Sequence, residues 1–490
     1  MRLRTPRAAA PCRAVAELSA SSLTLFALGA CAAVGGSAPR ERLGPPAGAL
    51  ASDVPATSDG ASTDAGVGPA GQSRPLVHGT FTTRAIARRT QGATDVDLWA
   101  FLSADVGDPE GGLRGATRRT PWSARFVGRL HADVDGDDGD QFDGLDDRND
   151  GSVVGRVYDA WAAWRSDDED IALVRLGRQS EAATPVFLVW DGVRVESRPL
   201  GDANVVLGAY GGASTHQFES SNDGDRLFGL WAEGRPWRGG SVRLDYVHAE
   251  DERAIGAFED DLFGLSVRHR FDRAWRAAAA FTTLGSDARD LDADATWTSA
   301  DGRSSVRGTY YELFETQSAN PLEFDTFSET LFDWFPFRRA GLLGWTMLGE
   351  RWRLEGGIDA RDVDDEDDEG RFNRDVRRLH VTVSADDLLG AGTTVAVTGD
   401  DWQSDARDVQ SLGATVTAPV GPRADVSVGT YYAAYEVDLV LGTEREDVRT
   451  WFASWTLDRA EDVSFDTAYA FQDTEFGEFH TVRVTLRWRF

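Results

Sequence analysis

The chain ends in Thr481-Val-Arg-Val-Thr-Leu-Arg-Trp-Arg-Phe490, and this stretch decides the fold. Side chains alternate between the two faces of a β-strand, so its hydrophobic residues share one face and its arginines share the other. The hydrophobic face consists of Val482, Val484, Leu486, Trp488 and Phe490. Soluble sandwiches and transmembrane barrels both contain such strands, so one strand alone leaves the choice open.

The same alternation recurs upstream, in segments of about ten residues separated by Gly, Asp, Asn and Arg. It starts at His78 and continues to the last residue. The clearest hydrophobic faces are Val463, Phe465, Tyr469 and Phe471; Val242, Leu244 and Tyr246; and Leu379, Val381 and Val383. The residues between them are polar or charged, which predicts an all-β chain.

Hydrophobic residues make up 41% of the 490 residues, but they are never concentrated in one block. No stretch approaches the roughly 18 uninterrupted apolar residues of a membrane-spanning helix. If this chain crosses a membrane, it must therefore cross as strands.

Two features favour the membrane over a soluble sandwich. Aromatic residues stand at the ends of the apolar faces, where the lipid interface of a barrel has its aromatic girdles; they include Trp451, Trp455, Trp488 and Phe490. The connections also alternate in length, as in outer-membrane barrels. Short turns at 200–202, 301–303 and 421–422 interleave with long polar connections at 213–224, 251–260, 315–341, 362–373 and 436–446.

The sequence therefore predicts a transmembrane antiparallel up-and-down β-barrel in the outer membrane of a Gram-negative cell. Counting segments gives about 22 strands, within an accepted range of roughly 16 to 24, and single-chain bacterial barrels have even numbers. Closure is required because lipid offers no partner to an unpaired backbone group. We expect outer-membrane lipid and lipopolysaccharide as partners, and the barrel-assembly machinery to bind the C-terminal strand that ends at Phe490.

The N-terminus has the order of an export signal: several arginines, an apolar core and small residues. We predict a signal over 1–31, a disordered exported linker over 32–76 and the barrel over 77–490. Leu28-Gly29-Ala30-Cys31 fits either a lipoprotein signal, with lipidation at Cys31, or an ordinary cleavage site. Since Cys12 and Cys31 are the two cysteines, the barrel has no thiol for catalysis or metal binding.

The formal net charge is -30, with 81 acidic against 51 basic residues. Binding to nucleic acid requires a basic face, so we expect no nucleic-acid partner. The seven histidines accompany no recognisable hydrolase or metalloprotease motif. We therefore expect no enzymatic activity and no catalytic residues.

Two short motifs follow each other closely, Leu176-Gly177-Arg178-Gln179 and Trp190-Asp191-Gly192-Val193-Arg194, after a segment at 157–161 that contains Tyr and Trp. They resemble the "LGRQ" and "DGVR" motifs, and the strand rich in Tyr and Trp before them, of the alginate-export family of outer-membrane porins. A further stretch, 332–337, is similar to a Phe/Pro-rich element found later in such proteins. The resemblance implies a porin-like channel, with Arg175, Arg178 and Arg194 lining the pore.

The polar faces of other segments mix charges of both signs, such as Arg156 with Asp159. These charges either set a field across the pore that orients solutes or neutralise one another. The further predicted pore-lining residues are Arg243, Asp245, Arg353, Glu355, Asp466, Arg483 and Arg487.

Two stretches suggest roles for the outer connections. Oxygen ligands separated by glycines suit Ca²⁺ at Asp133, Asp135, Asp137, Asp138 and Asp140, although the spacing is not that of an EF-hand and a solvated acidic loop is the alternative. The second stretch is unusually apolar and is expected either to constrict the pore or to pack at the rim. Its candidate constricting residues are Phe332, Trp334, Phe335 and Phe337.

Taken together, these features predict a channel for passive or weakly selective passage of small solutes or a polysaccharide. Apart from Ca²⁺ at the acidic outer loops, no cofactor is expected. The alternative is a surface-structural or adhesion barrel whose acidic outer loops bind ions. An open lumen would distinguish the channel from the structural or adhesion barrel.

Overall fold

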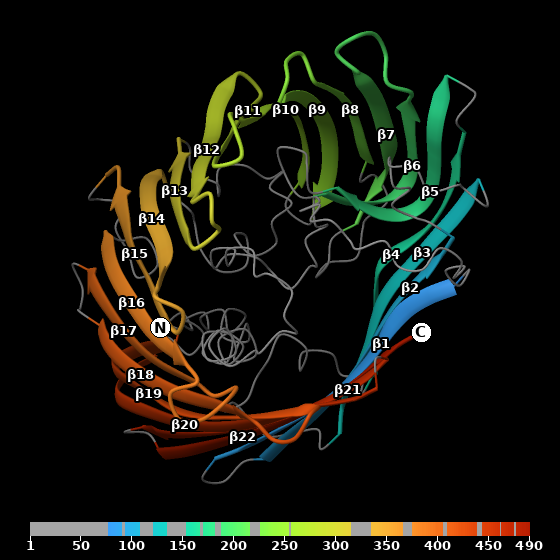
Figure 1. Ribbon diagram of the computed structural model, residues 1–490. Helices are drawn as coiled ribbons and strands as arrows, with labels where there is room; N and C mark the ends of the chain where they lie inside the picture. Colours follow the sequence, from blue (N-terminus) through green and yellow to red (C-terminus); the bar gives the residue numbers. More distant parts are fainter. Residues whose placement is uncertain are drawn as a thin grey trace, which may run out of the picture.

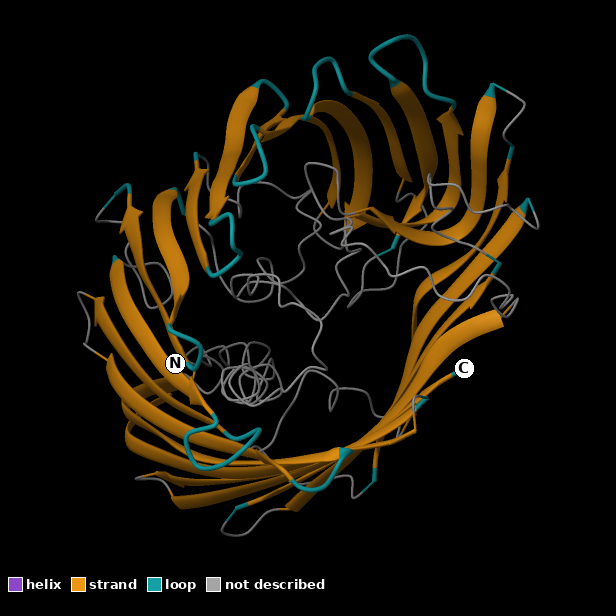
Figure 2. Ribbon diagram, in the orientation of Figure 1, coloured by secondary structure: helices purple, strands orange, loops and turns teal. Residues whose placement is uncertain are grey.

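The computed structural model consists of strands and the turns between them (Figure 2). It describes residues 77–90, 94–107, 121–134, 153–166, 170–181, 188–215, 226–253, 256–314, 335–365, 375–404, 409–438, 443–460, 462–474 and 477–490. Within these ranges, no helix is long and apolar enough to cross a membrane.

The strands follow one another along the chain in a simple order. They are β1 (Val77–Arg89), β2 (Thr94–Val106), β3 (Trp122–Asp133), β4 (Val153–Arg165), β5 (Ile171–Glu181), β6 (Leu188–Ser197), β7 (Val206–Ser214), β8 (Arg226–Gly234), β9 (Gly240–Arg253), β10 (Gly256–Arg270), β11 (Trp275–Leu284), β12 (Asp287–Thr298), β13 (Ser304–Leu313), β14 (Phe337–Leu348), β15 (Trp352–Val363), β16 (Val376–Asp386), β17 (Thr394–Ser404), β18 (Val409–Pro419), β19 (Ala424–Asp438), β20 (Thr443–Ala460), β21 (Val463–Thr474) and β22 (Gly477–Arg489).

These strands form one closed 22-stranded antiparallel sheet, as the sequence predicted. Each strand pairs with the next along the chain, and β1 also pairs with β22, so the two ends of the chain complete the ring (Figure 1). At the seam Gly79 N donates to Phe490 O at 2.8 Å, and Phe490 N donates to Gly79 O at 3.0 Å. Closure leaves no sheet edge with unpaired backbone groups, which lipid could not satisfy.

Two of the predicted long connections are shorter than expected. The β9–β10 pairing continues to Arg253 opposite Gly256, and the β19–β20 pairing continues to Asp438 opposite Thr443. The polar residues there marked the end of the apolar face, but they do not end the strands. Backbone pairing needs no apolar side chain, so a hairpin extends into water beyond the membrane.

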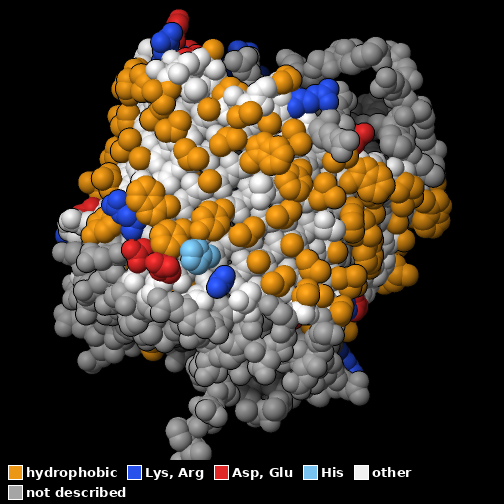
Figure 3. Space-filling model, turned by 90° about the horizontal axis from the view of Figure 1, so that it is seen from below, with side chains coloured by type: hydrophobic (Ala, Val, Ile, Leu, Met, Phe, Trp, Pro, Cys, Tyr) orange, Lys and Arg blue, Asp and Glu red, His pale blue; other side chains and the backbone are white. Residues whose placement is uncertain are grey.

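The outer face of the sheet is an apolar belt. Figure 3 shows hydrophobic side chains over much of one side of the barrel wall, with few charged groups among them. In β22 the belt includes Val482, Leu486 and Trp488, all exposed, as the alternation of the last strand predicted. An exposed apolar surface of this kind is matched to lipid rather than to water.

The belt differs at its two ends. We call the end with the turns at 198–205, 299–303, 349–351 and 420–423 the short-turn rim, and the other end the long-loop rim. Tryptophans on the outer face gather towards the short-turn rim: Trp122, Trp164, Trp275, Trp297, Trp352, Trp455 and Trp488. The connection between β2 and β3, at 107–121, is an exception to the short turns.

Three outward tyrosines lie farther from the short-turn rim than these tryptophans, and their hydroxyl groups have polar partners. The hydroxyl of Tyr246 donates to Asp261 at 2.7 Å, and that of Tyr310 donates to Glu312 at 2.7 Å. Tyr469 shares a hydrogen bond of 2.8 Å with His480. An amphipathic ring with a polar tip is suited to the boundary between lipid and water.

A closed barrel with an apolar belt between aromatic ends is the architecture of an outer-membrane protein. The protein therefore lies in the outer membrane. In such barrels the short turns face the periplasm, which assigns the short-turn rim to the periplasmic side.

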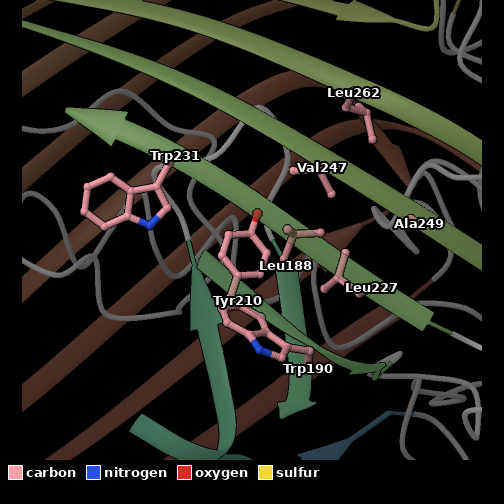
Figure 4. Packing of buried hydrophobic residues seen from close by; sticks show 8 residues of the cluster. All are labelled: Leu188, Trp190, Tyr210, Leu227, Trp231, Val247, Ala249 and Leu262. Carbon is pink, nitrogen blue, oxygen red and sulfur yellow. The ribbon is translucent and has the colours of Figure 1, made fainter. Parts of the chain in front are cut away.

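Strands β7 and β8 pack through two contacts between a glycine of one strand and an aromatic ring of the other. Gly208 on β7 stands directly opposite Trp231 on β8, and Tyr210 stands opposite Gly229. Each ring lies over the opposite glycine, where a Cβ atom would otherwise stand. Tyr210 and Trp231 belong to a buried cluster on the inner face of β6 to β10 (Figure 4).

We predict that Gly208→Ala destabilises the barrel by about 1–3 kcal/mol, because its methyl group overlaps the ring of Trp231 and the ring must move. Gly399→Ala is the matched control, since Gly399 also lies in a strand but has no atom within 4 Å of the place where a Cβ would stand. Urea unfolding of both variants in detergent, followed by tryptophan fluorescence, measures the difference. Equal unfolding midpoints would show that the ring contact is unimportant.

Candidate functional site on the inner wall

The inner wall of the barrel is identified by strand register. Residues directly opposite each other in an antiparallel pair lie on the same face of the sheet. Arg483 on β22 is opposite Ile86 on β1, Ile86 is opposite Asp97 on β2, and Asp97 is opposite Asp133 on β3. Followed around the ring, this face is mostly polar and charged, apart from the hydrophobic cluster on β6 to β10, whereas the other face is the apolar belt.

Most of the predicted pore-lining residues lie on this inner face. They are Arg175, Arg194, Arg243, Asp245, Arg353, Glu355, Asp466, Arg483 and Arg487. Several are paired with one another: Arg243 donates to Asp245 at 2.8 Å, and Arg353 donates to Glu355 at 2.8 Å. Contact of these residues with a passing solute stays a prediction.

Arg178 is the exception, and its expected place in the pore is wrong. It lies on the outer face directly opposite Asp191, near the exposed Leu176 and Val193. Its Nε and Nη2 atoms donate to the two carboxylate oxygens of Asp191 at 2.8 and 2.7 Å. The physical reason is parity: Arg178 is three residues after Arg175, so the two cannot share a face of one regular strand. The odd spacing between Arg175 and Arg178 was visible in the sequence.

Phe337 also differs from its predicted role in a constricting loop. It is the first residue of β14, almost fully buried on the inner face, and the guanidinium of Arg361 lies 4.0 Å from its ring centroid. It is therefore part of the wall. Phe335 is half-buried just before β14, and Phe332 and Trp334 lie outside the described residues.

The acidic stretch is described only at its start. Asp133 is the last residue of β3 and stands opposite Asp97 on the inner face. Asp135, Asp137, Asp138 and Asp140 lie outside the described residues, as do Cys31 and the rest of 1–76. In the part of the chain that the structure describes, no group of three or more His, Asp or Glu side chains is arranged to hold a metal ion.

Arginines stacked on tryptophans are a recurrent feature of the inner wall that we did not predict. The Arg175 guanidinium lies 4.1 Å from the ring centroid of Trp161, that of Arg243 lies 4.5 Å from Trp231, and that of Arg353 lies 4.7 Å from Trp345. Arg129 on Trp99 and Arg378 on Trp402 form the same arrangement. Such stacking holds a guanidinium flat against the wall while leaving it charged.

Glu181 and two arginines of the inner wall form a buried network. Glu181 forms ion pairs with Arg194 from β6 and, at 3.9 Å, with Arg243 from β9. Arg194 also contacts Glu196 at 2.7 Å, and both guanidiniums lie over the ring of Trp231. The network therefore links β5, β6, β8 and β9 from the inside of the barrel and neutralises both arginines.

Comparisons with known proteins add only weak similarities. No protein-family model matches the chain, and no curated protein sequence matches it. The resemblance to the alginate-export family therefore stays a hypothesis that rests on the short motifs alone.

Among solved structures, the chain is similar to the translocation pore of the P pilus usher PapC, with a TM-score of 0.46, 12% identity, and coverage of 85% of this chain and 99% of that one. It is also similar to a BenF-like porin from Pseudomonas fluorescens Pf-5, with a TM-score of 0.43, 12% identity, and coverage of 85% and 98%. The outer-membrane protein opdK from Pseudomonas aeruginosa gives a TM-score of 0.41, 11% identity, and coverage of 84% and 98%. Similarity this weak decides nothing about function, whereas the strand pairing and the two faces of the wall bear on it directly.

We predict that Glu181→Gln destabilises the barrel by about 3–5 kcal/mol, because it leaves Arg194 and Arg243 buried with one fewer compensating charge. Glu355→Gln is the control: the Arg353–Glu355 pair is about a quarter exposed on each side, and its loss should cost less than about 1 kcal/mol. Urea unfolding in detergent measures both. A Glu181→Gln loss no larger than that of the control would contradict the bracing role.

Proposed function

We propose that the protein is an outer-membrane channel for passive, weakly selective passage of small hydrophilic solutes. One observation carries the proposal: the 22-stranded barrel is apolar on its outer face and mostly polar on its inner face. A wall with this polarity is what a water-filled passage through lipid requires. No catalytic step is proposed.

The inner face of β16 to β20 supports weak selectivity. This arc includes a band of small hydroxylated side chains, which can exchange hydrogen bonds with many solutes. Thr382 and Thr398 hydrogen-bond to each other at 2.9 Å, and Thr417 and Ser427 at 2.8 Å. Such a surface favours hydrophilic solutes without demanding a particular charge.

Charges on the inner wall mostly neutralise one another, as in the pairs of Arg339 with Asp359 and Arg378 with Asp400. This favours small solutes of either sign over a polymer of one charge. A polysaccharide is the other solute that we propose to test, by adding a soluble neutral or acidic polysaccharide and looking for block of the current.

We predict stable single-channel steps when the refolded protein is inserted into a planar lipid bilayer, because its inner wall can be wetted. Insertion is checked separately, by protection of the barrel from protease in vesicles. Barrels with 22 strands include transporters whose lumen is plugged. Absence of steps from inserted protein would therefore reject the channel and favour a plugged, structural or adhesion barrel.

We also propose three partners that follow from the membrane location. Lipopolysaccharide would surround the long-loop rim, the barrel-assembly machinery would bind the β22 strand ending at Phe490, and Ca²⁺ would bind the acidic stretch from Asp133 to Asp140. Deletion of Phe490 is expected to reduce the amount of protein assembled in the outer membrane, as measured by heat-modifiable mobility in gels. Normal assembly of this variant would reject that contact.

If Ca²⁺ binds the acidic stretch, a chelator should lower the thermal unfolding temperature of the purified protein, and Ca²⁺ should restore it. The reason is mass action, since a ligand of the folded state stabilises that state. A variant with Asn at Asp135, Asp137 and Asp138 should lose the response. An unfolding temperature that is unchanged by chelator would reject the site.

A further inference from the structure

Nearly all charged side chains of the inner wall have a partner. Among the described inner-face charges more than three residues from a strand end, Arg175 on β5 and Asp292 on β12 have no ion pair and no hydrogen bond. Arg487 also has none, but it lies near the end of β22. Neighbouring arginines and acids do have such contacts, for example Arg194 with Glu181 and Asp294 with Arg307. The charges of Arg175 and Asp292 therefore lack a counter-charge in contact with them.

Arg175 lies beside other arginines. It stands directly opposite Arg194, and Arg194 and Arg165 repel its charge. Glu196 and Asp159 attract it, but neither contacts it. Like charges directly opposite each other across a strand pair destabilise a sheet. Arg194 forms ion pairs with Glu181 and Glu196. Arg175 instead lies over the ring of Trp161, and this contact does not neutralise the charge of Arg175.

Asp292 is the acidic counterpart. It stands opposite Ala280 on β11 and Tyr311 on β13. Asp294 and Asp290 on its own strand repel it, and Arg307 attracts it without contacting it. Those two neighbours lie near arginines, Asp290 at 3.3 Å from Arg289 and Asp294 at 3.6 Å from Arg307. The carboxylate of Asp292 has no such contact.

We infer that Arg175 and Asp292 are the residues that determine the ion preference of the proposed channel, Arg175 by attracting anions and Asp292 by attracting cations. The inference rests on the proposed function and names its selectivity-determining residues. The fields of the two charges in an ion pair largely cancel beyond a few ångströms. The field of a charge without a contacting partner extends over the screening length, about 10 Å at 0.1 M salt and about 30 Å at 0.01 M. β5 and β12 lie at separate places on the ring, with β6 to β11 between them (Figure 1), so the two charges act on different parts of the lumen.

The test is the reversal potential of single channels in a potassium chloride gradient at low ionic strength. Arg175→Gln is expected to lower the ratio of chloride to potassium permeability by about fivefold, the factor that roughly 1 kcal/mol of charge interaction in water gives. Asp292→Asn is expected to raise the ratio by a similar factor. Both shifts should shrink at 1 M salt, where the screening length is about 3 Å.

Two double variants separate local charge from net charge, because each leaves the net charge unchanged. Arg175→Gln with Asp292→Asn is expected to reduce conductance at low salt, since the wall loses both of the charges that concentrate ions. Arg339→Gln with Asp359→Asn removes a neutralised pair and is expected to leave low-salt conductance and ion preference unchanged. Folding of every variant is checked by its heat-modifiable mobility in gels.

The outcomes are distinguishable. Absence of single-channel current from inserted wild-type protein rejects the proposed function and this inference with it. A conducting wild type whose ion preference is unchanged in Arg175→Gln and in Asp292→Asn rejects the inference alone. Equal effects of the two double variants would show that paired and unpaired charges count alike, which also rejects it.

Discussion

Lipid gives the peptide backbone no hydrogen-bond partner, and the rest of this structure depends on that constraint. Every strand must be paired on both sides, so the chain has to return to its own beginning. The return is made where Phe490 pairs with Gly79, and it joins the two ends of a sheet that otherwise follows chain order. Once the ring is closed, each side chain of a strand points either to the lipid or to the interior of the barrel.

This division explains why so much of the fold could be predicted from the sequence. Within one strand, alternation assigns faces without any knowledge of the neighbours, as it did for the last strand and for Leu379, Val381 and Val383. The number of strands followed from counting such segments. Strand ends were less predictable, because the hairpin after His248 continues through charged residues that alternation does not forbid.

The inner wall was less predictable because its contacts depend on register between strands. Arg156 and Asp159 share the inner face despite their odd spacing, because the β3–β4 register shifts at Val127 and Gly128. A bulge of this kind leaves little trace in one sequence. The same limit applies to stacking: Arg175 lies on Trp161 because β4 and β5 pair as they do. Nor did the net charge of -30 describe the inner wall, because position on alternate residues, rather than total charge, decides which side chains face inward.

The reciprocal contacts of Gly208 with Trp231 and of Gly229 with Tyr210 have a consequence for how this wall can evolve. Each glycine is small because a ring from the neighbouring strand occupies its space. A larger residue at Gly208 becomes acceptable only after Trp231 has become smaller, and the opposite order leaves a gap. The two positions of each pair should therefore be inherited together, as compensated changes in related sequences, and drift at one of them alone should be rare.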